Sequence, residues 1–192
     1  HLTNRRQRQM CIRDRSELAS SSLLLKAVAS WRVDPQEWLE SAFDRLPETV
    51  RVNPLRQDSE WVEQWLKDVG AVRIGWFKGP GSAWEMPFTR GSAEGEVREL
   101  LKSLHETGRI TRQEIVSMIP VLAMDISPGE TVLDMCASPG SKTTQIAECL
   151  GDRGIVFANE ISNSRANTLV SNVQRHASRS IIVINHDGRH IP

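Results

Sequence analysis

The sequence predicts an α/β protein in which a small α+β domain precedes the first half of an open parallel sheet. Three short apolar runs, 131–134, 154–158 and 180–184, are rich in β-branched residues and alternate with segments of helical periodicity. This alternation is typical of parallel strands joined by crossover helices, and such strands are usually covered on both faces. In the first half, shorter helical and strand-like segments are separated by Pro and Gly turns.

Residues 1–15 differ from the rest of the chain. They contain five Arg and one Asp and have no apolar periodicity. The stretch resembles a translated sequencing adapter, so we expect a non-native or disordered tail and exclude it from the fold. A basic arm that binds nucleic acid is the alternative.

Residues 16–107 predict a helical segment followed by the small α+β domain. Asp34 is expected to cap a helix that begins at Pro35. Further helices are expected at 58–69 and 93–107, and strands at 49–52, 71–74 and 84–88. Pro87 cannot donate a ladder hydrogen bond and therefore predicts an edge position for the last strand. The second domain is expected at 108–192, beginning with a helix over 108–120 that packs beneath the parallel sheet.

Composition excludes several classes of protein. The chain has 24 basic and 24 acidic residues, which gives no overall basic signature for nucleic acid. Cys11, Cys136 and Cys149 have no metal-ligand spacing, so we expect no metal and a reduced, cytoplasmic protein. No apolar run reaches the roughly 18 residues of a membrane span, and no signal peptide is visible.

The most informative segment is Thr-Val-Leu-Asp-Met-Cys-Ala-Ser-Pro-Gly-Ser-Lys-Thr-Thr-Gln at 131–145. It predicts a strand, a tight turn and a helix start, where unpaired backbone N–H groups can hold a ligand. A phosphate-binding loop needs Gly before Lys, but Ser141 intervenes and Met135 replaces the first Gly. The dinucleotide fingerprint needs three Gly residues, and only Gly140 is present.

The segment instead resembles motif I of the Nop/Sun family of RNA cytosine-C5 methyltransferases, Asp-x-Cys-Ala-Ala/Ser-Pro-Gly-Ser/Gly-Lys-Thr. The resemblance implies a Rossmann-like sheet that binds S-adenosylmethionine. A weaker match, Arg-Val-Asn-Pro-Leu-Arg at 51–56, resembles the RNA-positioning domain of the family, and Gln113 and Ser117 match the segment before motif I. The turn residues expected at the cofactor are Cys136, Ala137, Ser138, Pro139, Gly140, Ser141 and Lys142.

Two acids follow the next two strands. Open parallel sheets bind ligands beyond the carboxyl ends of their strands. The resemblance implies that Glu160 binds the ribose hydroxyls of the cofactor and that Asp187 reaches the adenine edge. The alternative is that both acids cap helices. Arg165 is expected either to support Glu160 by an ion pair or to lie on a solvated helix face.

The family uses one cysteine in a Pro-Cys run and one in a Thr-Cys run, and neither dipeptide occurs in this chain. We therefore assign no catalytic residue, expect these cysteines beyond Pro192, and expect an inactive fragment of an enzyme that is monomeric when intact. The expected partner is RNA, with tRNA preferred to rRNA. The alternatives are an rRNA methyltransferase and a non-catalytic module that binds S-adenosylmethionine or RNA.

Overall fold

The computed structural model describes residues 23–42 and 44–190, so the predictions for residues 1–22 lie outside the described residues. The chain divides into two compact units between Leu46 and Pro47. In the first unit, α2 (Leu23–Ala29) is followed by α3 (Pro35–Ser41), which begins at the predicted Pro. The rings of Trp31 and Trp38 pack edge to face with their centroids 5.6 Å apart.

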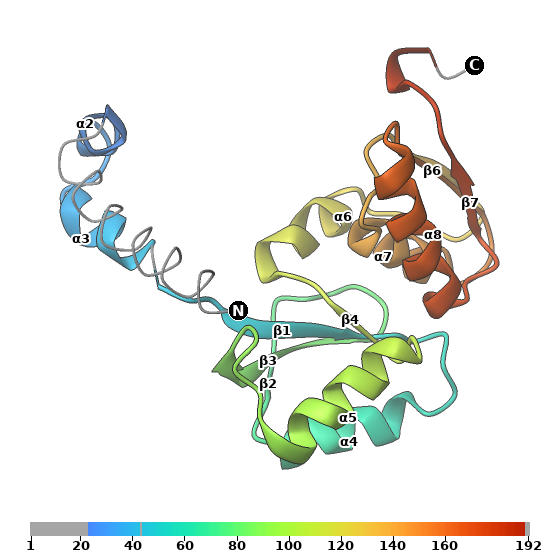
Figure 1. Ribbon diagram of the computed structural model, residues 1–192, viewed down its shortest axis with the longest axis horizontal. Coiled ribbons are helices and arrows are strands. Elements are labelled where there is room, and N and C mark those ends of the chain that lie inside the picture. The colour runs from blue at the N-terminus through green and yellow to red at the C-terminus, as the bar shows by residue number, and fades with distance from the viewer. Residues whose placement is uncertain (1–22, 43, 191–192) are drawn as a thin grey trace. The chain divides into compact units, whose positions relative to one another are not determined.

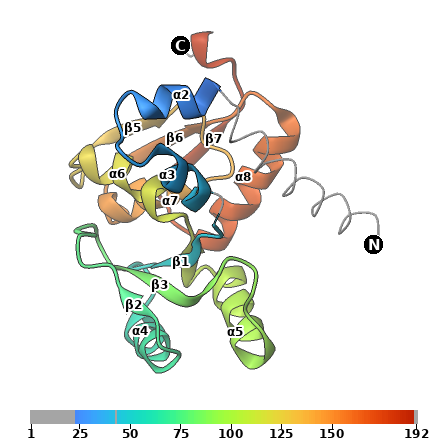
Figure 2. The same cartoon turned by 90° about the vertical axis from the view of Figure 1, so that its left-hand side faces the viewer.

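The second unit begins with a four-stranded antiparallel sheet in the order β2-β3-β1-β4. The strands are β1 (Pro47–Val52), β2 (Val72–Arg73), β3 (Ser82–Thr89) and β4 (Ile110–Arg112). Helices α4 (Ser59–Asp68) and α5 (Gly95–Glu106) lie on the same face of this sheet (Figures 1 and 2). Apolar side chains of both helices, including Val62, Leu66, Leu101 and Leu104, form one core with the strands.

Two sequence predictions about this sheet were wrong. β3 lies between β1 and β2 and is not an edge strand. Pro87 is tolerated because β2 pairs only with Trp84 and Glu85, and the register with β1 is irregular between Pro47 and Thr49. The missing N–H therefore leaves no ladder partner unsatisfied.

The segment predicted as a helix at 108–120 was the second error. It forms β4, the 3-10 helix η1 (Ile115–Met118) and the start of α6 (Ile119–Ala123). Because β4 pairs with β1, the small sheet extends past residue 107, where its end was predicted.

The parallel sheet has the order β5-β6-β7, with β5 (Thr131–Asp134), β6 (Ile155–Asn159) and β7 (Ile181–Ile184). These strands lie within one residue of their predicted positions. Helix α7 (Ser141–Leu150) connects β5 to β6, and α8 (Asn163–His176) connects β6 to β7. Residues 188–190 form a final 3-10 turn, η2 (Gly188–His190).

Only one face of the parallel sheet is well covered within the described residues. Val132 and Val156 are buried in a core with α6 and α7. The residues that alternate with them point to the other face, where Leu133 is 44% exposed and Ile182 is 45% exposed. The apolar strands had suggested cover on both faces, so this exposure differs from the sequence prediction.

Candidate functional site

The carboxyl ends of the three parallel strands meet at a cavity of 320 Å³. Four of the residues predicted at the cofactor line it: Cys136, Glu160, Arg165 and Asp187. The register explains why they meet, because Asp134 pairs with Ala158 and Asn159 pairs with Ile184. The turns that follow the strands therefore start at the same edge of the sheet.

Asn159 connects the three turns and was not predicted as a site residue. Its Nδ2 donates to the carbonyl oxygens of Met135 at 3.1 Å and His186 at 3.0 Å, and its Oδ1 accepts from the His186 N–H. The Ala137 N–H donates to the Asn159 carbonyl at 2.8 Å. An Asn directly after an apolar strand is the sequence signal that could have indicated this role.

Glu160 is 3% exposed and lines the cavity. Its Oε1 accepts from the Ser162 N–H at 3.0 Å, and its Oε2 lies 3.4 Å from Arg165 Nε. The ion pair with Arg165, one of two readings of the sequence, is therefore present. Arg165 also donates to the Ser138 carbonyl at 3.0 Å, while Ser138 Oγ donates to the Arg165 carbonyl at 2.9 Å. These bonds fix the turn against the start of α8.

Asp187 reaches the same cavity, but its carboxylate is already held by a neighbour. Arg189 Nη2 lies 2.6 Å from Asp187 Oδ2, and Arg189 Nε lies 3.0 Å from Oδ1. These hydrogen bonds hold the pKa of the Asp187 carboxyl below its ordinary value. A ligand that uses Asp187 as an acceptor must therefore share it with Arg189.

The predicted turn contributes to two different cavities. Cys136 faces the strand-end cavity, whereas Pro139, Gly140 and Ser141 line a second cavity of 390 Å³ on the side of the small sheet. Ala137 and Ser138 are buried and line neither cavity. Lys142 is exposed and lines neither cavity.

The local fold of the turn has clear causes. α7 starts at Ser141, and Gly140 precedes it with φ of 107°, a left-handed conformation that favours Gly. A Cβ on Gly140 would come within 2.9 Å of Leu169 Cδ1, so α8 packs directly against the turn. Thr143 Oγ1 donates to Asp134 Oδ2 at 2.7 Å and ties the first turn of α7 to the end of β5.

The strand-end cavity fits the nucleoside part of a cofactor. Its volume lies near the lower end of the roughly 300–1,000 Å³ typical of ligand pockets. The buried Glu160 carboxylate is an acceptor for hydroxyl donors. Met135 and Ile161, 50% and 63% exposed, offer apolar surface beside it for a flat ring.

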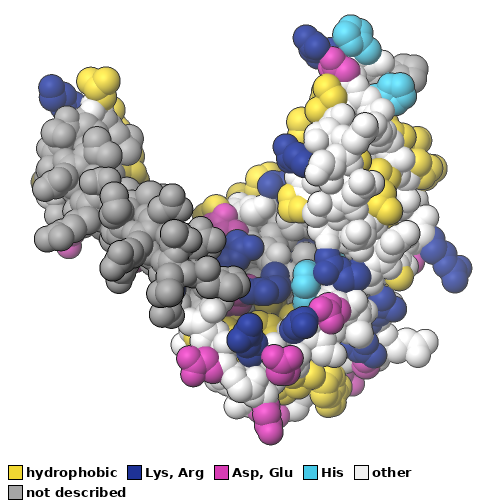
Figure 3. All heavy atoms as spheres, viewed as in Figure 1, with side chains coloured by type: hydrophobic (Ala, Val, Ile, Leu, Met, Phe, Trp, Pro, Cys, Tyr) yellow, Lys and Arg dark blue, Asp and Glu magenta, His cyan; other side chains and the backbone are white. Residues whose placement is uncertain are grey.

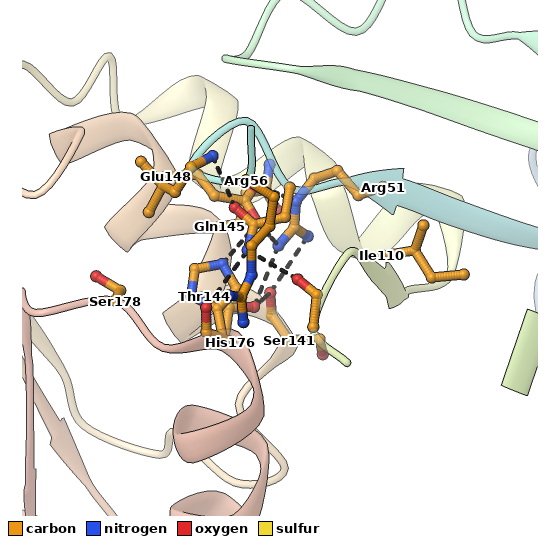
Figure 4. A network of polar contacts seen from close by, with 12 residues as sticks. Arg51, Arg56, Ile110, Ser141, Thr144, Gln145, Glu148, His176 and Ser178 are labelled. Atoms are coloured by element: carbon orange, nitrogen blue, oxygen red, sulfur yellow. Dashed lines mark hydrogen bonds and ion pairs between the residues drawn. The ribbon is translucent and has the colours of Figure 1, made fainter. Parts of the chain in front are cut away.

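A buried polar network joins the small sheet to α7 (Figure 4). Arg51 of β1 is 0% exposed, and its Nε lies 2.6 Å from Oε2 of the equally buried Glu148. Arg51 also donates to Thr144 Oγ1 at 3.1 Å and to Gln113 Oε1. Burial alone would raise the pKa of the Glu148 carboxyl, but the charge of Arg51 and the hydrogen bonds from Arg51 and His176 outweigh it and lower the pKa.

The same network accounts for the other residues matched in sequence. Gln113 Nε2 donates to the Ser117 carbonyl at 3.1 Å and to Gln145 Oε1 at 3.0 Å. Asn53 is fully buried, and its Nδ2 donates to the Gly108 carbonyl at 2.9 Å. Asn53 Nδ2 also donates to the His176 carbonyl at 3.4 Å, so Asn53 and Gln113 both connect the small sheet to the helices of the parallel sheet.

Within residues 23–42 and 44–190, no three His, Cys, Asp or Glu side chains form a group that could hold a metal ion. The same part of the chain has no helix that is long and apolar enough to cross a membrane.

Comparison with known proteins identifies the family. Residues 121–192 match the family described as 16S rRNA methyltransferase RsmB/F. The chain is 33% identical over 143 residues to the tRNA (cytosine(49)-C(5))-methyltransferase of Pyrococcus abyssi, which covers 74% of this chain and 43% of that protein. It is also 33% identical over 167 residues to the Ribosomal RNA small subunit methyltransferase F of Vibrio atlanticus. That alignment covers 86% of this chain and 34% of the Vibrio protein. The chain belongs to the Nop/Sun family.

A solved structure agrees with this assignment. The crystal structure of a methyltransferase homolog protein from Pyrococcus horikoshii has a TM-score of 0.70 and 26% identity, and covers 90% of this chain and 55% of that chain. The Rossmann-like fold predicted from the sequence is therefore confirmed, and the Nop/Sun methyltransferases use S-adenosylmethionine as expected. This Nop/Sun chain spans less than half the length of the two curated relatives named above.

Proposed function

We propose that the protein to which these residues belong methylates carbon 5 of cytosine in RNA with S-adenosylmethionine as the methyl donor. The observation that carries the proposal is that Cys136 of the motif, Glu160 and Asp187 line one cavity beyond the strand ends. We assign Glu160 to the ribose hydroxyls, with Arg165 holding its carboxylate, and Asp187 to the purine edge. The bound cofactor would supply an electrophilic methyl group.

tRNA is the substrate that we favour, with rRNA as the alternative. The Pyrococcus abyssi relative is named for tRNA and the Vibrio atlanticus relative for rRNA, at the same 33% identity. The preference for tRNA rests on the segment 108–192, which resembles the tRNA branch, in particular the Asn-His-Asp ending of the third strand at 185–187. A cytoplasmic location and a monomeric state stay predictions.

Replacement of Glu160 tests the cofactor assignment. We expect Glu160→Ala to weaken S-adenosylmethionine binding about tenfold, because losing a buried acceptor costs roughly 1–3 kcal/mol. Isothermal titration calorimetry on the purified chain measures the affinity. Glu99→Ala, an exposed acid on α5, is the matched control and should bind as the unsubstituted chain does. Unchanged affinity in Glu160→Ala, with the same fold by circular dichroism, would remove Glu160 from the site.

These 192 residues are expected to bind without transferring a methyl group. Carbon 5 of cytosine becomes nucleophilic only after a thiolate adds at carbon 6, and the chain contains neither the Pro-Cys nor the Thr-Cys dipeptide that supplies thiols in the family. The measurement is transfer of labelled methyl groups to an unmodified tRNA transcript and to a 16S rRNA transcript. Methylation of either RNA above the level without protein would contradict this expectation.

A further inference from the structure

The second cavity, of 390 Å³, lies within the unit that begins at Pro47. It is bounded by α5, β4, the turn before α7, and the C-terminal half of α8. Figure 3 shows Lys and Arg side chains and a His on this face, with several acidic side chains beside them. Because the strand-end cavity is lined by a different set of residues, the two cavities are distinct.

The ionisable side chains that line this second cavity are all basic. They are Arg90, Arg112, Arg175, His105 and His176, and no acid lies among the lining residues. The Arg112 guanidinium is held by Glu48, with Nε 2.8 Å from Oε1. Among the described residues, none forms a hydrogen bond or ion pair with the guanidinium groups of Arg90 and Arg175. Burial lowers the pKa of His105, and the positive charge of Arg175 lowers it further. A bound anion would relieve the repulsion between Arg175 and a protonated His105.

His176, one of the residues that line this cavity, has a ring nitrogen without a hydrogen-bond partner among the described residues. The residue is 3% exposed, and its Nε2 lies 3.0 Å from Glu148 Oε1. Its Nδ1 is buried and has no partner among the described residues. Buried polar atoms are almost always hydrogen-bonded, so the unpaired Nδ1 indicates a missing partner. Since Nε2 is already engaged by the Glu148 carboxylate, Nδ1 is the ring nitrogen that is left for a ligand.

The backbone adds donors on another wall. Pro139, Gly140 and Ser141 line the cavity where the ten-residue helix α7 begins. The first N–H groups of a helix have no intrahelical acceptor, and the helix dipole favours negative charge at this end. Phosphate groups are commonly bound by this combination of helix start and Arg side chains.

We propose that this cavity binds a phosphate group of the RNA backbone. The proposal rests on the proposed function, since it assigns a contact to the RNA substrate. A phosphate fits better than a base, because no Phe or Trp lines the cavity and stacking platforms for bases are usually aromatic. Backbone contacts position a nucleic acid without reading its sequence, so the site would fix where the RNA enters.

The test is a double variant, Arg90→Gln with Arg175→Gln, because neither side chain bonds to another described residue. We expect it to bind an unmodified tRNA transcript about five- to twentyfold more weakly near 0.1 M salt, and to lower the slope of log K against log salt by about 1–2. The control is Lys67→Gln with Arg73→Gln, exposed cations on α4 and β2. An unchanged slope in the cavity variant, or an equal loss in the control, would overturn the proposal.

Two further measurements separate the possible failures. Arg90→Lys with Arg175→Lys keeps both charges and should keep the salt slope, whereas a merely structural role would not be rescued in this way. S-adenosylmethionine affinity should stay the same in every variant. If the unsubstituted chain binds neither tRNA nor S-adenosylmethionine, the proposed function fails. If it binds both and the cavity variant keeps its slope, only the phosphate site is wrong.

Discussion

The ion pair between Arg51 and Glu148 connects the small sheet to the parallel sheet. Both side chains are fully buried, and they come from β1 and α7. A resemblance over 51–56 marked Arg51 in the sequence, but nothing in the sequence identified Glu148 as its partner. The reason is physical: residues 97 positions apart meet only after both sheets have formed. Sequence patterns report local periodicity and cannot show such a pairing.

Glu148→Gln tests the energetic role of this pair. The variant leaves the Arg51 charge buried without compensation, which should cost about 3–5 kcal/mol of unfolding free energy at pH 7. The folded-state pKa of Glu148 lies below its ordinary value of 4.5, so its contribution is fully present above pH 4.5 and is lost as the pH falls through the folded-state pKa. The difference between the two proteins in urea unfolding should therefore shrink at acid pH. Glu99→Gln is the exposed control, and a difference that stays constant down to pH 3 would argue against the ion pair.

The strand-end site was predictable in part. Cys136, Glu160, Arg165 and Asp187 meet as expected, because strand order alone fixes where strand-end residues lie. The sequence did not separate Pro139, Gly140 and Ser141 from the rest of the turn, since a contiguous motif gives no sign that its two halves face different cavities. It also gave no sign that Arg189 holds the Asp187 carboxylate.

The apolar parallel strands were predicted well, whereas the segment 108–120 was not. β5, β6 and β7 are apolar, bounded by turns, and correctly located. β4 has three residues and pairs with β1, so its conformation depends on a tertiary contact that outweighs the helical pattern of 108–120. Weak local preferences are commonly overridden in this way.

The backbone at Gly108 lies very close to the end of α8. Gly108 has φ of +69°, and a Cβ there would lie 1.9 Å from the Arg175 carbonyl oxygen at the end of α8. Gly108→Ala should therefore lower the unfolding free energy by at least about 3 kcal/mol, well above the roughly 1–2 kcal/mol that a left-handed Ala costs by itself. Gly151→Ala is the matched control, since Gly151 has φ of +56° after α7 and open space around its Cβ position. If Gly108→Ala and Gly151→Ala lost equal unfolding free energy in thermal unfolding, the backbones at Gly108 and Arg175 would be able to separate with little loss of stability.

One face of the parallel sheet β5-β6-β7 is incompletely covered within the described residues. β5 pairs only with β6 within the described residues, and Leu133, Ile155 and Ile182 are 44%, 39% and 45% exposed. Unpaired strand edges and contiguous apolar surface both promote association with other chains.

We expect the 192-residue chain to self-associate at micromolar concentration. Light scattering should detect oligomers, and Leu133→Ser with Ile182→Thr should reduce them because both exposed side chains lie on the uncovered face. Val72→Thr on β2, 68% exposed, is the control and should leave the oligomers unchanged. A monodisperse monomer with one sharp thermal transition would contradict the expectation and would favour the non-catalytic module.

The contact between Gly108 and α8, together with the Arg51 network, has a consequence for dynamics. Opening the small sheet would expose Glu148 and Gln145 to water, and opening α7 would leave Arg51 buried without its counter-ion. Local opening of either sheet alone therefore has a high free-energy cost. The amides of β1 and α7 should exchange with solvent through a single shared opening, so the two sheets behave as one cooperative folding unit although they differ in architecture.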